Sequence, residues 1–116
     1  MRVLIHFVPV GVELPATDAY RPASLDAEGF VHLCRAEQVA DVRRRHFAGQ
    51  RVRALVLDAA RLEAPVVEED LYGHGAFPHL YGPIPADAVV AEVEVEPGDD
   101  DDWLTARLER AVIALA

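Results

Sequence analysis

Runs of apolar residues, several of them rich in β-branched side chains, mark the strands that this sequence predicts. The first is Val3–Val8, a continuous apolar run with one histidine, which ends at Pro9 and predicts a buried strand. Phe30–Cys34 predicts a second, short strand. Val52–Asp58 is the clearest strand of the chain, and Pro65–Glu69 is expected to pair beside it.

The alternation of apolar and acidic residues over Val89–Val95 is typical of a half-exposed antiparallel strand. Two stretches rich in proline or glycine separate the predicted elements. Pro15–Gly29 is expected to be a loop with a short helical turn around Thr17–Tyr20, and Asp70–Pro85 is expected to be a second loop.

Two segments have helical character. Ala36–Phe47 predicts a helix that ends before Gly49. Its core-facing side chains are expected to be Val39, Ala40, Val42 and Phe47. A last amphipathic helix should begin at the acidic run 99–102, whose carboxylates complement the helix dipole, and run to about Leu115.

Mixed strands with two helices predict an α+β fold: a single small domain with a mostly antiparallel, split sheet. Its core is expected to span residues 1–98, with residues 99–116 forming an acidic-capped helix packed on the same domain. A length of 116 residues suits one domain with one core. One cysteine excludes an internal disulfide framework and a cysteine-based zinc cluster.

The net charge of −9 is unevenly distributed along the chain. Residues 1–53 carry eight arginines and six acids, whereas residues 54–116 carry three arginines and fourteen acids. The acidic total argues against broad binding to nucleic acid, which requires neutralisation of phosphates. The sequence shows neither a membrane-spanning run nor a secretory pattern, so we expect a cytoplasmic protein without membrane contact, a monomer or a weak homodimer.

Histidines within apolar strands are the first candidates for chemistry. His6 and His32 each lie inside a predicted strand. Each is either a core histidine bonded to a neighbouring backbone group or a neutral imidazole that faces a cleft. A zinc site made from histidines has no H-x-x-x-H or H-E-x-x-H spacing to support it, so we expect no metal.

The segment Phe77–Pro85 combines aromatic residues, His79 and three prolines. It predicts a stiff loop, which is either a rigid packing corner or one wall of a small-molecule pocket. In the pocket interpretation, Tyr81 or Phe77 stacks on a flat ring and His79 bonds to the ligand.

Other polar residues give weaker signals. Arg21 and Arg35 could each bind a phosphate or a carboxylate with two hydrogen bonds. The run 43–45 of three arginines is expected to form the solvated face of its helix. Cys34 is expected to be a buried, inert thiol, and Ser24, the only serine, precedes no nucleophile-elbow motif.

Three motifs stand out along the chain: Y-R-P-A-S-L-D-A-E-G-F-V-H-L, A-E-Q-V and F-P-H-L-Y-G-P-I-P. Taken together, they make the chain resemble the bacterial domain of unknown function 952 family from about Val3 to Val95. That family is similar in fold to ADP-ribosyltransferases and RNA 2′-phosphotransferases, which share a split-sheet NAD-binding core. The resemblance implies that His6 holds the nicotinamide ribose and that His32 contacts the ribose or a phosphate. The third catalytic position, often Glu, has no secure match, and His79 or Tyr81 is expected to lie near it in the site.

The same resemblance implies a tentative NAD cofactor with Arg21 on its pyrophosphate, and Ser24, Arg35, Phe77 and Tyr81 as further binding residues. The chain departs from the family where Cys34 and Arg35 replace a usual Ser-Thr pair. We therefore expect an enzyme or degenerate enzyme that binds NAD or an ADP-ribosylated or 2′-phosphorylated compound. The alternatives are a non-catalytic nucleotide or metabolite binding module and a tailoring enzyme in which histidines act as general acid and base.

Overall fold

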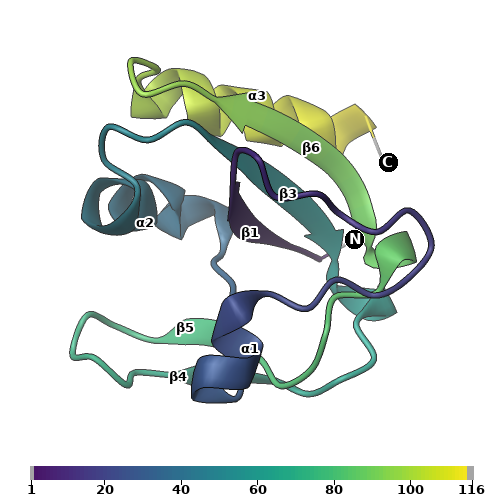
Figure 1. Ribbon diagram of the computed structural model, residues 1–116. Coiled ribbons are helices and arrows are strands. Elements are labelled where there is room, and N and C mark those ends of the chain that lie inside the picture. Colours follow the sequence, from purple (N-terminus) through teal and green to yellow (C-terminus); the bar gives the residue numbers. More distant parts are fainter. Residues whose placement is uncertain (1, 115–116) are drawn as a thin grey trace.

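A computed structural model describes residues 2–114 and contains two separate antiparallel sheets (Figure 1). The strands of the first sheet lie in the order β1 (Val3–Pro9), β3 (Val52–Asp58), β6 (Val89–Val95). Those of the second lie in the order β2 (Val31–His32), β5 (Phe77–Leu80), β4 (Val66–Glu69). This arrangement confirms the predicted small α+β domain with an antiparallel, split sheet.

The helices are α1 (Ala23–Glu28), α2 (Val39–His46) and α3 (Asp101–Ala114). Short 3₁₀ turns occur at Ala36–Gln38, Ala59–Arg61 and Ala86–Ala88. In Figure 1, α2 and α3 lie beside the first sheet, whereas α1 lies with the second sheet. None of the helices in the described residues is long and apolar enough to cross a membrane.

Two apolar clusters hold these layers together because side chains alternate between the two faces of a strand. Val56 of β3 packs with Val39 of α2 and Leu104 of α3 in the cluster beneath the helices. Leu55, its neighbour in β3, packs with Leu80 of β5 in the cluster between the two sheets. Burial on both faces explains why the middle of β3, residues 54–57, is a continuous apolar run.

The second sheet corrects two sequence-based predictions. Phe77–Leu80, expected to be part of a loop, is the central strand of that sheet. Val66–Glu69 pairs with this strand and not with Val52–Asp58. Pro78 made the segment resemble a loop because proline has no backbone N–H to donate to a neighbouring strand. Its carbonyl oxygen nevertheless accepts a hydrogen bond from the backbone N–H of Leu33 at 3.1 Å.

The first loop also differs from the prediction. Thr17–Tyr20 forms no helical turn, and the helix lies further on, in α1. Its boundaries carry local signals, since Pro22 precedes it and Gly29 ends it in the left-handed conformation at φ 89°. The predicted helix Ala36–Phe47 is confirmed in outline, as a 3₁₀ turn followed by α2.

The core-facing side of α2 is confirmed for Val39, which is buried, and for Val42 and Phe47, which pack partly buried against the same cluster. Ala40 is only half-buried and does not belong to that cluster. At the start of α3, the carboxylate of Asp100 accepts a hydrogen bond from the backbone N–H of Trp103 at 2.7 Å, which is the expected acidic cap. The predicted end at Leu115 lies outside the described residues.

Arg43 departs from the predicted solvated face, because it is only 8% exposed. Its guanidinium group donates to the carbonyl oxygen of Glu96 at 2.8 Å and pairs with Asp101 at 3.3 Å. It thereby ties α2 to the turn between β6 and α3. The next residue, Arg44, has a side chain that is 71% exposed and pairs with Asp41 on the same helix.

We expect Arg43→Met to lower the free energy of unfolding by ~2 kcal/mol, because a buried charged donor is removed together with its bonds to Glu96 and Asp101. Arg44→Met, the matched control one residue later, should cost less than ~0.5 kcal/mol. Urea denaturation of both variants measures the difference. Equal losses in the two variants would contradict the anchoring role of Arg43.

Candidate functional site

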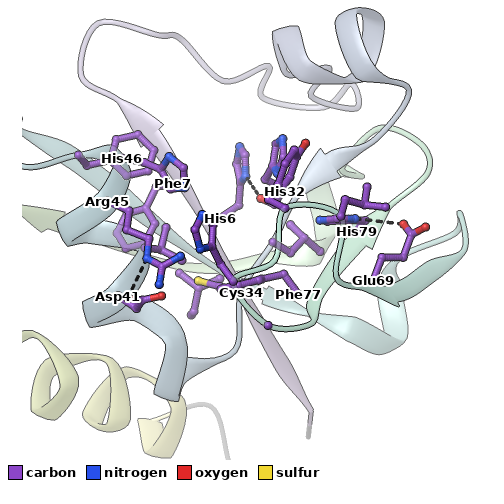
Figure 2. Close-up of a pocket in the computed structure, with 18 of the residues that line it drawn as sticks. His6, Phe7, His32, Cys34, Asp41, Arg45, His46, Glu69, Phe77 and His79 are labelled. Atoms are coloured by element: carbon purple, nitrogen blue, oxygen red, sulfur yellow. Dashed lines mark hydrogen bonds and ion pairs between the residues drawn. The ribbon is translucent and has the colours of Figure 1, made fainter.

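A cavity of about 550 Å³ lies among β1, α2 and the second sheet (Figure 2). All five histidines of the chain line it: His6, His32, His46, His74 and His79. Much of the remaining wall is apolar, with Ile5, Phe7 and Phe77 among its residues. The chain thus gathers its whole histidine content, from five separate segments, around one concave surface.

His32 and His79 lie directly opposite each other on neighbouring strands, β2 and β5. Because residues in register share one face of a sheet, their rings meet on the cavity side. The ring centroids are 5.5 Å apart, and the ring planes are nearly perpendicular at 81°. The two imidazoles are therefore close enough to act on one small bound molecule.

Glu28, the last residue of α1, holds the ring of His32. Nε2 of His32 lies 2.7 Å from the Glu28 carboxylate, which also accepts a hydrogen bond from the Tyr72 hydroxyl at 3.2 Å. The pKa of Tyr72 is raised by desolvation and, to a lesser extent, by this carboxylate. Since a carboxylate only accepts, Nε2 of His32 carries a proton and Nδ1 is the remaining ring nitrogen.

Glu69, at the end of β4, holds His79 in the same way. Nδ1 of His79 donates to the Glu69 carboxylate at 3.0 Å, and the Tyr81 hydroxyl donates to the same oxygen at 2.5 Å. The bond from Tyr81 and, after it, the bond from His79 lower the pKa of Glu69. The bond to Glu69 raises the pKa of Tyr81.

The other ring nitrogen of His79 belongs to a side chain that is 2% exposed and stacks on Phe30 at 4.2 Å between centroids. Among the described residues, every buried side-chain nitrogen or oxygen has a hydrogen-bond partner. Nε2 of His79 has no protein partner there, so it is not fully buried, and the His79 side chain is one of those that line the cavity. This nitrogen is a proton acceptor when His79 is neutral.

His6 joins this group through the backbone. Its Nδ1 donates to the carbonyl oxygen of His32 at 2.8 Å. Burial lowers the pKa of His6 to about 4, the backbone bond opposes that change, and the nearby His32 adds a smaller lowering. His6 is consequently neutral near pH 7, and its Nε2 is a hydrogen-bond acceptor.

The structure brings together some of the predicted site residues and not others. His6, His32, His79 and Phe77 line the cavity, and Tyr81 adjoins it through Glu69. Three predicted binding residues are not among the lining residues: Arg21, Ser24 and Arg35. Arg21 pairs with Asp26 on the exposed side of α1, and Arg35 is held by Glu37 and Glu68.

Sequence reasoning missed the two carboxylates, Glu28 and Glu69. The four-residue spacing of Glu28 and His32 gave no usable signal, because helix α1 ends at Glu28 and His32 lies in a strand, so the contact does not follow one helical turn. No signal existed for Glu69 either, whose partner His79 lies ten residues away and is reached through the pairing of β4 with β5.

The thiol of Cys34 also lines the cavity, but it is 2% exposed and burial raises its pKa to about 12. This confirms the expected buried thiol. Within residues 2–114, no group of three or more His, Cys, Asp or Glu side chains has the arrangement of a metal site.

The two antiparallel sheets, the covering helices and the histidine-lined cavity define a small α+β domain with a concave site of the size that small molecules occupy. The chain belongs to the family described as protein of unknown function (DUF952), whose model matches residues 12–92. This confirms the resemblance found in the sequence motifs.

Solved structures of protein CC0527 from Caulobacter crescentus are similar in fold. One has 24% sequence identity and a TM-score of 0.67, and a double mutant of the same protein has 23% identity and a TM-score of 0.66. Each comparison covers 81% of this chain and 86% of the other. A comparison with curated proteins finds no match.

The low pKa of His6 predicts an acid-sensitive fold. An unfolded His6 takes up a proton near pH 6.5, whereas the folded one does so only near pH 4. Protonation therefore favours the unfolded chain as the pH falls from 6.5 to 4. The free energy of unfolding should fall by ~3 kcal/mol over this range, since each pKa unit is worth ~1.4 kcal/mol. In His6→Gln, the difference in unfolding free energy between pH 7 and pH 4 should shrink by about that amount.

Denaturant titrations of both proteins at several pH values measure this difference, and ¹⁵N NMR of the His6 ring checks its pKa directly. A His6 ring that titrates near its usual value would contradict the burial argument.

A second prediction concerns Glu69. Tyr81→Phe removes the hydroxyl that contributes most to its lowered pKa, so the pKa of Glu69 should rise toward its usual value. Tyr72→Phe is the matched control, because Tyr72 bonds to Glu28 instead. Carboxyl ¹³C NMR titration reports both variants. An unchanged Glu69 in Tyr81→Phe would show that the hydroxyl does not act on it in solution.

Proposed function

We propose that this protein is an enzyme that uses His79 and His32 as general base and general acid on a small organic molecule held in the cavity. The observation that carries the proposal is the pair of Glu–His couples on neighbouring strands, with ring centroids 5.5 Å apart. A histidine positioned by a carboxylate has a fixed tautomer, and its protonated form is stabilised.

In the proposed mechanism, Nε2 of His79 takes a proton from a substrate C–H group. Glu69 accepts the Nδ1 hydrogen and stabilises the imidazolium that results. His32, in its protonated form, returns a proton to a second position of the same molecule. The reaction class is thus proton transfer within a substrate, as in an isomerisation or an elimination.

His6 has a different task in this proposal. Its low pKa makes it a poor base at neutral pH, but its free Nε2 suits a hydrogen bond from a substrate hydroxyl or amide. The apolar side chains of Ile5, Phe7 and Phe77 reduce the water around the bound molecule, which strengthens the polar interactions at the reacting group.

A second candidate is binding or turnover of NAD or of an ADP-ribosylated or 2′-phosphorylated compound, as the fold similarity of ADP-ribosyltransferases and RNA 2′-phosphotransferases to this family implies. One observation favours it: His6 and His32, the two residues that the resemblance assigns to the ligand, are joined by a hydrogen bond. Against it, Arg21 and Arg35 pair with acids outside the cavity wall, which leaves a pyrophosphate without those cations.

The proposal is tested by solvent exchange, which detects proton transfer whatever the product is. A fragment library together with NAD, ADP-ribose and a 2′-phosphorylated dinucleotide is incubated with the protein in D₂O. Loss of C–H signals in ¹H NMR reports proton transfer. We expect exchange in one or more small fragments, and a decrease of at least ~100-fold in His79→Gln, which keeps an amide donor for Glu69 but no base.

His74→Gln is the matched control, because His74 lines the same cavity but no carboxylate among the described residues holds its ring. It should retain the exchange activity. Exchange that survives in His79→Gln would overturn the assignment of the base. Release of nicotinamide or phosphate from the nucleotides would establish the second candidate, and ligands that bind without exchange or turnover would make the protein a binding module.

A further inference from the structure

One end of the cavity holds an arginine beside the carboxylate of Asp41. Arg45 is the arginine that lines it among the described residues, out of eleven in the chain. It lies on the last turn of α2 beside His46, with a side chain that is 36% exposed. In Figure 2, Arg45 and Phe7 lie at one side of the cavity, whereas His79 and Glu69 lie at the other.

Asp41 orients this arginine without using all of its donors. Its carboxylate accepts from Nε of Arg45 at 3.1 Å and from Nη2 of Arg44 at 2.7 Å. Asp41 lines the cavity too, and two guanidinium groups share its one carboxylate, so these three side chains together carry a net charge of +1. The terminal nitrogens of Arg45 make no hydrogen bond within residues 2–114, so their donors are available to an anion.

The wall between the two ends is apolar. Phe77 and Cys34 lie between Arg45 and His79 in Figure 2, and Phe7 and Val42 continue the same wall. A molecule that spans the cavity therefore meets a cation, then a hydrophobic passage, and then the paired histidines. A single guanidinium suits one negative charge, whereas a pyrophosphate would bring two.

We propose that the ligand of this cavity is a monocarboxylic acid, with its carboxylate on Arg45, an apolar body along Phe7 and Phe77, and its polar reacting group between His32 and His79. The inference names the substrate class of the acid–base enzyme proposed above and rests on that proposal. Arg45 is its specificity-determining residue.

The test uses three probes of similar shape and different charge: 3-phenylpropanoate, 3-phenylpropanamide and 3-phenylpropylamine, with the shorter and longer homologous acids included. Dissociation constants come from ¹H–¹⁵N NMR titration of the folded protein. We expect the acid of best-matched length to bind at least ~10-fold more tightly than its amide, with the amine weakest. The preference for the acid should disappear in Arg45→Met.

Arg51→Met is the matched control, since Arg51 pairs with Glu94 and Glu96 and does not line the cavity. It should keep the preference for the acid. Binding of acid and amide with equal strength, tighter binding of the amine, no binding of any acid, or a preference that survives in Arg45→Met would each overturn the carboxylate assignment. The exchange experiment above judges the acid–base chemistry separately, because it depends on His79 and not on the charge of the probe.

Discussion

The passage of the chain from one sheet to the other at residues 32–34 is the constraint on which the site depends. The backbone N–H of Leu33 donates to Pro78 in the second sheet. Cys34 exchanges two hydrogen bonds with Ile5 in the first sheet, at 2.7 and 2.8 Å. Two consecutive buried residues thus bond to different sheets, and the three backbone groups that make these bonds are satisfied.

This passage brings three histidines together through one residue. The carbonyl oxygen of His32 accepts the hydrogen bond from His6, and its side chain lies opposite His79. A shift of the strand by one residue would turn the His32 ring to the other face and separate the group. The geometry of the site is therefore fixed by strand register and by the crossing, and only indirectly by the loops around them.

Each of the two carboxylates that hold the histidines is shared between two hydrogen-bond donors. Glu28 and Glu69 each accept from one histidine and one tyrosine, so that neither carboxylate faces the apolar wall alone. Two bonds to one carboxylate oxygen hold the histidine and tyrosine side chains in one arrangement, which a reacting group requires. At the opposite end, Arg45 retains unused donors, so the two ends of the cavity present different chemical groups to a ligand.

The sequence alone determined the elements whose signal is local. The residues of Val52–Asp58 predicted the clearest strand, the spacing of Val39, Val42 and Phe47 placed the buried side of α2, and the motif residues identified the family. Only the tertiary structure decided that Phe77–Leu80 is a central strand and that Glu69 reaches His79. Pairing of this kind depends on register between distant segments, and the order of apolar and polar residues within one segment carries no record of its partner.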